Sequence, residues 1–157
     1  MKHNMVVILD NIRSKQNVGS VFRTSDALGV SHVYLIGTTP TPVDRFNRPV
    51  GEIAKTALGA ECVVPWTYAK TLAPIIRRLK SSGYTIVALE QDSQSIDYKK
   101  FKPESDIALI LGNEVEGVGK STLKQSDVIV EIPMQGSKES LNVSVAYGVA
   151  GFRILGR

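Results

Sequence analysis

Short runs of apolar residues alternate with longer segments of helical periodicity along this chain. Five runs are apolar at every position, which predicts strands covered on both faces, as in a parallel sheet. The predicted strands are residues 6–9, 33–36, 86–89, 107–111 and 128–130, and the predicted helices are 18–28, 68–81, 119–124 and 141–155. Gly29 and Gly83 stand where helices often end in a glycine. The alternation predicts an α/β fold, one parallel sheet with helices on both faces.

Length and composition predict a single domain. The chain has 157 residues, of which 43% are hydrophobic and 22% charged, as in an ordinary globular protein. No internal repeat or linker divides it, so we expect one domain over residues 1–157. No apolar run approaches about 20 residues, and the N-terminus lacks the features of a signal peptide. The single cysteine, Cys62, fits a reducing cytosol, so a cytoplasmic location without membrane contact is expected.

Charge and metal-ligand spacing restrict the chemistry. A net charge of +4 permits nucleic-acid binding without requiring it. His3, His32 and Cys62 are far apart and make no metal-ligand spacing, so no metal centre is expected.

A long loop rich in proline and threonine is predicted over residues 37–49. Arg45 and Arg48 flank Phe46 in it, a combination suited to phosphate and a stacked base. A solvated surface loop explains the same residues equally well.

The last of three polar turns joins a loop to the C-terminal helix. Ser140 suits the N-cap of that helix, where free N–H groups also allow ligand binding. That structural role does not explain Asn142 and Ser144, which have poor helix propensity in the first turn.

The middle turn, Gly112-Asn113-Glu114, follows a predicted strand. Residues 117–121 resemble the end of a phosphate-binding loop, but the opening glycine of that motif would fall at Glu114, whose carboxylate would repel a triphosphate. The first strand is also followed by no glycine-rich dinucleotide turn. Glu114 either contacts a substrate or accepts hydrogen bonds from N–H groups of adjacent loops.

The first turn opens the N-terminal helix. Asn17 suits an N-cap, and Gly19 permits close approach by another segment or a ligand. Arg23 lies more than one turn into the helix. It is either a cation of the functional site or an ordinary solvated arginine.

Together the three turns resemble the motifs of the SpoU/TrmH branch of the SPOUT RNA methyltransferases. The matching residues are Asn17, Gly19, Arg23 and Thr24; Gly112, Asn113, Glu114 and Gly117; and Ile132, Pro133, Met134, Gly136, Ser140, Leu141, Asn142 and Ser144. The resemblance covers essentially the whole chain. We expect one methyltransferase domain without the separate RNA-binding domain or helical extensions that many relatives carry.

The resemblance implies a parallel α/β fold with a C-terminal deep trefoil knot, acting as a homodimer with its active site across the interface. It implies methyl transfer from S-adenosylmethionine to a ribose 2′-hydroxyl of tRNA or rRNA, with S-adenosylhomocysteine as product and no metal. Two alternatives stay open: a non-catalytic RNA-binding module of this fold, and a knotted enzyme that methylates a base. Arg23 favours the ribose.

The resemblance also implies roles for individual residues. The catalytic set is Arg23, Asn17, Glu114, Ser140 and Asn142; the cofactor-binding set is Leu89, Gly112, Ile132, Met134, Ser140 and Leu141; the RNA contacts are Arg23, Arg45 and Arg48. An arginine stays protonated, so Arg23 is a poor general base. We expect it to clamp an RNA phosphate and stabilise the developing alkoxide.

Overall fold

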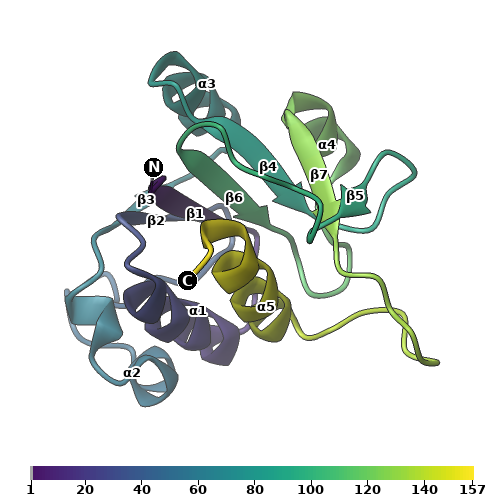
Figure 1. The fold of residues 1–157 in the computed structure, drawn as a ribbon. Coiled ribbons are helices and arrows are strands. Elements are labelled where there is room, and N and C mark those ends of the chain that lie inside the picture. Colours follow the sequence, from purple (N-terminus) through teal and green to yellow (C-terminus); the bar gives the residue numbers. More distant parts are fainter. Residues whose placement is uncertain (1) are drawn as a thin grey trace.

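A computed structural model describes residues 2–157, and Figure 1 shows its seven strands in one parallel sheet. The strands are β1 (Met5–Asp10), β2 (His32–Ile36), β3 (Trp66–Ala69), β4 (Thr85–Leu89), β5 (Ile96–Asp97), β6 (Ile107–Leu111) and β7 (Val128–Glu131). The helices are α1 (Lys15–Leu28), α2 (Gly51–Ala57), the 3₁₀ turn η1 (Ala60–Cys62), α3 (Ala73–Ser81), α4 (Lys120–Gln125) and α5 (Val143–Leu155). The predicted α/β class is confirmed; the knot stays a prediction.

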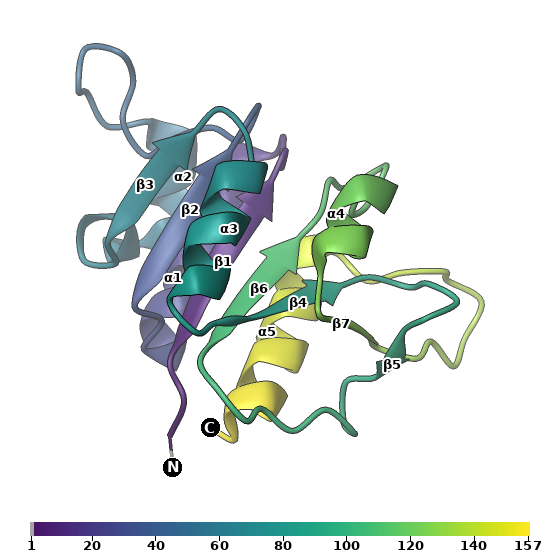
Figure 2. The same ribbon diagram turned by 90° about the horizontal axis from the view of Figure 1, so that it is seen from above.

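Helices cover both faces of the sheet (Figures 1 and 2). Successive side chains of a strand point to opposite faces, so Val7 and Leu9 pack under α1, α2 and α5, while Val6 and Ile8 pack under α3. This burial on both faces accounts for the uninterrupted apolar runs. Helices α1 and α5 are joined by a buried hydrogen bond of 2.8 Å between the hydroxyls of Ser25 and Tyr147.

The strand order is β3-β2-β1-β6-β4-β7-β5. The direction in which successive strands are added to the sheet reverses beside β1, and a ligand site is expected at this point. From β1 the chain moves outward through β2 and β3, then returns to build β4, β6 and β7 on the other side. In open α/β sheets ligands bind at the carboxyl ends of the strands beside such a reversal. Here β6 lies at that reversal, between β1 and β4.

Several element boundaries differ from the sequence predictions. Strand β3 occupies the start of the helix predicted over 68–81; its central residues are exposed at the edge of the sheet, so it has no apolar run. The cap predictions at both helix starts were wrong. Ser14, not Asn17, caps α1 by accepting from the N–H of Asn17 at 3.1 Å, and Asn142, not Ser140, caps α5. Gly29 ends α1 in the left-handed conformation, as predicted.

Candidate functional site

A cavity of about 520 Å³ lies at the carboxyl ends of β4, β6 and β7 and at the N-terminus of α5. We call it the edge pocket. It is lined by Leu89–Gln91, Leu111–Gly117, Glu131, Ile132, Met134, Glu139–Val143 and Ala146. All six residues predicted to bind the cofactor line it, as do Glu114 and Asn142 of the predicted catalytic set. Two of the three polar turns therefore form one cavity.

The turn after β6 is closed so tightly that glycine is required at two positions. A Cβ on Gly112 would overlap the backbone of Gly117 and Val118. Gly117 has a φ of +68°, and a Cβ there would overlap the carboxylate of Glu90. Asn113 and Gly117 exchange backbone hydrogen bonds of 3.1 and 2.8 Å. These contacts fix the shape of one wall of the edge pocket.

Glu114 holds the start of α1 in place. Its carboxylate accepts from the backbone N–H groups of Arg13 and Ser14, at 3.1 and 3.0 Å, and from Nδ2 of Asn17 at 3.2 Å. Partial burial by itself would raise the pKa of Glu114, but these donors outweigh it, so the pKa lies below its usual value. Of the two roles left open by the sequence, the structure shows the structural one.

Asn17 connects this turn to the last one. Its Oδ1 accepts from Nδ2 of Asn142 at 3.2 Å, and its own Nδ2 is the donor to Glu114. Asn142 in turn accepts from the N–H and the hydroxyl of Ser144, at 2.9 and 2.6 Å. The chain Glu114–Asn17–Asn142 thus joins all three turns, and capping explains the polar residues at 142 and 144.

Gly19 allows α2 to pack closely against α1. A Cβ on Gly19 would overlap Thr56 and the carbonyl of Ile53, so this glycine lets α2 approach α1. The close approach expected at Gly19 is therefore made by a helix of the same chain.

Two site residues were missed by the sequence analysis. Glu90 accepts from the N–H of Val118 at 2.8 Å, and Gln91 donates from Nε2 to the carbonyl of Glu139 at 2.6 Å. They connect the end of β4 to both walls of the edge pocket. Their position directly after a predicted strand, next to Leu89, was the only signal in the sequence.

The edge pocket is rich in carboxylates. Five glutamates line it: Glu90, Glu114, Glu116, Glu131 and Glu139. The lining residues include no lysine, arginine or histidine. Like charges gathered in this way favour a cationic ligand. Within residues 2–157, no three His, Cys, Asp or Glu residues are placed to hold a metal ion. No helix in the same range has the length and apolar character of a membrane span.

The predicted arginines lie outside the edge pocket. Arg23 is exposed on α1, and Arg45 and Arg48 lie in the loop between β2 and α2. Asn17 is buried behind the pocket wall, where it acts through Glu114 and Asn142. Within one chain, the structure does not bring Arg23 to the cavity.

Comparison with known proteins identifies the family. The model of the SpoU rRNA methylase family matches residues 4–152. The chain belongs to this family. The resemblance carried by the three motifs is confirmed.

Curated relatives are identical to this SpoU family member at about a third of the aligned positions. It is 35% identical over 145 residues to the 23S rRNA (guanosine-2′-O-)-methyltransferase RlmB of Neisseria meningitidis serogroup B, covering 92% of this chain and 55% of that protein. With RlmB of Ralstonia nicotianae it shares 36% over 152 residues, 94% of this chain and 57% of that protein. The chain thus spans little more than half the length of these relatives.

Solved structures agree on the fold. An AdoMet-bound rRNA methyltransferase from Sinorhizobium meliloti superposes with a TM-score of 0.87 at 28% identity, over 98% of this chain and 56% of that one. The SpoU methyltransferase AviRb from Streptomyces viridochromogenes, in complex with AdoMet, superposes with a TM-score of 0.85 at 21% identity, over 99% of this chain and 58% of that one.

Proposed function

We propose that this protein transfers a methyl group from S-adenosylmethionine to a ribose 2′-hydroxyl of RNA, in tRNA or rRNA. One observation carries the proposal: the six positions expected to hold the cofactor converge on one carboxylate-rich pocket. Family membership and relatives named as 23S rRNA guanosine-2′-O-methyltransferases support the same reaction class.

The edge pocket fits the proposed cofactor in size and chemistry. Its volume of about 520 Å³ is typical of cofactor sites. Leu89, Ile132, Met134 and Leu141 provide apolar contact for an adenine ring, and the missing side chain at Gly112 leaves backbone accessible. When bound there, S-adenosylmethionine supplies an electrophilic methyl group on a positively charged sulfur. The surrounding carboxylates favour that charge.

We assign to Arg23 the role of activating the ribose hydroxyl as a nucleophile. A ribose hydroxyl is a weak nucleophile and needs stabilisation as its proton leaves. The guanidinium stays protonated, binds the adjacent RNA phosphate with two N–H groups, and stabilises the developing alkoxide, while the phosphate takes the proton. Ser140 and Asn142 orient the target nucleotide at the rim of the pocket.

Because Arg23 lies outside the edge pocket of its own chain, we infer that it serves the pocket of a second copy. Helix α5 exposes an apolar stripe of Val145, Val149 and Phe152, which are 51, 40 and 38% exposed. Thr24 is next to Arg23, and its methyl group would be in van der Waals contact with a Cβ built on Gly148, which lies beside this stripe. A homodimer that covers the stripe would therefore include the Arg23 face of α1.

Transfer of a traceable methyl group tests the proposal and separates its alternatives. The protein is incubated with methyl-deuterated S-adenosylmethionine and unfractionated RNA, and the RNA is digested to nucleosides for mass spectrometry. Label on ribose is the expected result. Label on a base would instead identify a base methyltransferase. No label, together with no heat of S-adenosylmethionine binding by calorimetry, would identify a non-catalytic module.

A further inference from the structure

The loop between β2 and α2 ends in a compact hairpin, residues 43–49, which we call the loop tip. Val43 and Pro49 form an antiparallel bridge. Between them, the N–H of Asp44 donates to the carbonyl of Arg48, and the N–H of Asn47 donates to the carbonyl of Asp44, both at 2.9 Å. These backbone hydrogen bonds give the loop tip a defined shape.

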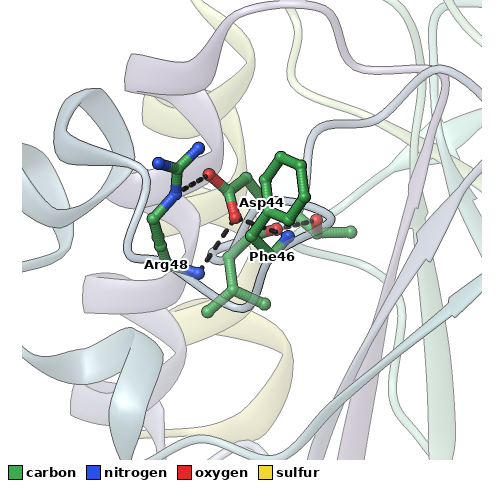
Figure 3. A network of polar contacts seen from close by, with 5 residues as sticks. Asp44, Phe46 and Arg48 are labelled. Atoms are coloured by element: carbon green, nitrogen blue, oxygen red, sulfur yellow. Dashed lines mark hydrogen bonds and ion pairs between the residues drawn. The ribbon is translucent and has the colours of Figure 1, made fainter.

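Asp44 organises the loop tip from inside (Figure 3). Its carboxylate accepts from the N–H of Phe46 at 2.8 Å, the N–H of Arg48 at 3.0 Å and Nε of Arg48 at 2.9 Å. The backbone donor of Arg48 is the main reason that the pKa of Asp44 lies below its usual value. The carboxylate thereby fixes both the Phe46 backbone and the Arg48 guanidinium.

Three planar groups meet at the surface of the loop tip. Phe46 is 62% exposed, and the guanidinium carbons of Arg45 and Arg48 lie 4.7 and 5.0 Å from the centre of its ring. Arg48 is paired with Asp44, whereas no carboxylate of residues 2–157 pairs with Arg45. A large exposed ring between two cations has no role in the core of this domain, but it matches the flat face of a base flanked by phosphates.

We propose that the loop tip is a stacking platform for an unpaired nucleotide of the RNA substrate, with the base on Phe46 and the phosphates at Arg45 and Arg48. This inference rests on the proposed function, since it takes RNA as the substrate. Only an unpaired base offers its face to a protein side chain, so the substrate class is a loop, bulge or single strand and not a regular duplex.

Stacking of a base on Phe46 is more favourable than the cation–π contact of Arg45 with the same ring. An exposed cation–π contact contributes about twofold to fivefold in an equilibrium constant. Stacking of a base on an aromatic side chain contributes about fivefold to 160-fold. A base therefore displaces Arg45 from the ring, and the freed guanidinium pairs with the phosphate of the same strand.

The loop tip and the edge pocket share one edge of the sheet. The loop leaves the carboxyl end of β2 and projects from the body of the molecule (Figure 2). Asn11, at the end of β1, links the two regions: its carbonyl accepts from Asn113 of the pocket turn at 2.8 Å, and its side chain accepts from the N–H of Thr38 at 3.0 Å. One RNA strand is thus able to follow a single edge of the protein.

Binding of two simple RNAs tests the platform. Fluorescence anisotropy measures the affinity of the full chain for an oligouridine and for an A-form duplex of equal length at one salt concentration. We expect Phe46→Ala to weaken oligouridine binding about fivefold or more and to leave duplex binding within about twofold. Phe46→Trp keeps a stacking face and should retain oligouridine binding. Val63→Ala, another exposed apolar residue, is the matched control.

Substitution of Arg45 distinguishes the contribution of charge to RNA binding from that of stacking. Arg45→Gln should weaken both RNAs and reduce the slope of log affinity against log salt by about one phosphate contact. The platform is overturned if Phe46→Ala leaves oligouridine binding unchanged, or if it weakens both RNAs equally. These assays need no methyl transfer, so failure of the proposed function appears separately, as absence of labelled ribose from the wild-type reaction.

Discussion

Asn142 donates a hydrogen bond to Asn17 at 3.2 Å, joining two residues that lie 125 positions apart in the chain. Because Asn17 also donates to Glu114, this one amide aligns the N-terminal helix with both walls of the edge pocket. The two asparagines of the first and last motifs are therefore positioning residues, and their amides act as a pair.

Removing the Asn17 side chain should destabilise the fold and the pocket together. Asn17→Ala removes two part-buried hydrogen bonds, to Glu114 and from Asn142, which together contribute about 1–3 kcal/mol of unfolding free energy. Denaturant unfolding checks the stability, and calorimetry with S-adenosylmethionine should show weaker binding. Gln16→Ala, on the exposed side of the same turn, is the control. Equal stability of the two variants would contradict the linking role of Asn17.

The ionised state of Glu114 should stabilise the fold with a defined pH dependence. Its folded pKa lies below the unfolded value of 4.5, so its contribution is present above that pH and is lost as the pH falls through the folded pKa. The difference in unfolding free energy between wild type and Glu114→Gln should be full near neutral pH and should shrink below about pH 4.5.

A pH series of denaturant titrations measures this difference. Glu116→Gln, in the same turn, is the control, since no hydrogen bond to the Glu116 carboxylate is formed within residues 2–157. A gap between wild type and Glu114→Gln that widens on acidification would be incompatible with a lowered pKa of Glu114 in the folded state.

The turn after β6 should tolerate a methyl group at one glycine and not at another. Gly117→Ala requires left-handed backbone from an L-residue, at roughly 1–2 kcal/mol, and displaces the Glu90 carboxylate. Gly119→Ala meets no atom within 4 Å and has an ordinary φ of −64°. We expect lower thermal stability and weaker S-adenosylmethionine binding only for Gly117→Ala. Similar losses in both variants would show that the turn does not depend on this close contact.

The sequence predicted the fold class and several of the residues that line the pocket, but not how they are connected. The central strands were predictable because burial on both faces leaves uninterrupted apolar runs, whereas β3 has exposed Thr67 and Tyr68 and β5 has only two residues. The positions that line the edge pocket were predictable because two of the three motifs follow strands that end at one edge of the sheet. Local pattern could not reveal that Ser14 caps α1 and leaves Asn17 free, because the partners of Asn17 are about 100 positions away.

Arg23 should affect turnover and not cofactor affinity. Arg23→Ala should lower kcat about 100-fold or more, the usual effect of losing one transition-state donor group. Arg23→Lys keeps the charge but loses the two-pronged contact, so it should also lose most of the activity. KM for S-adenosylmethionine should stay unchanged, because Arg23 is assigned to the RNA phosphate and the ribose oxygen and not to the cofactor.

Steady-state kinetics at saturating RNA measures both constants. Arg77→Ala, an exposed arginine on α3 at the other face of the sheet, is the control for loss of charge. Near-full turnover by Arg23→Lys would be inconsistent with the phosphate clamp.

The most direct measurement mixes two inactive variants. Arg23→Ala keeps an intact pocket, and Leu141→Arg places a cation in the pocket but keeps Arg23. If each site uses the arginine of the second copy, co-expressed chains should recover about a quarter of wild-type ribose methylation, because half of randomly assorted dimers contain one complete site of two. Activity no greater than that of the two variants assayed separately would contradict a site shared between two copies.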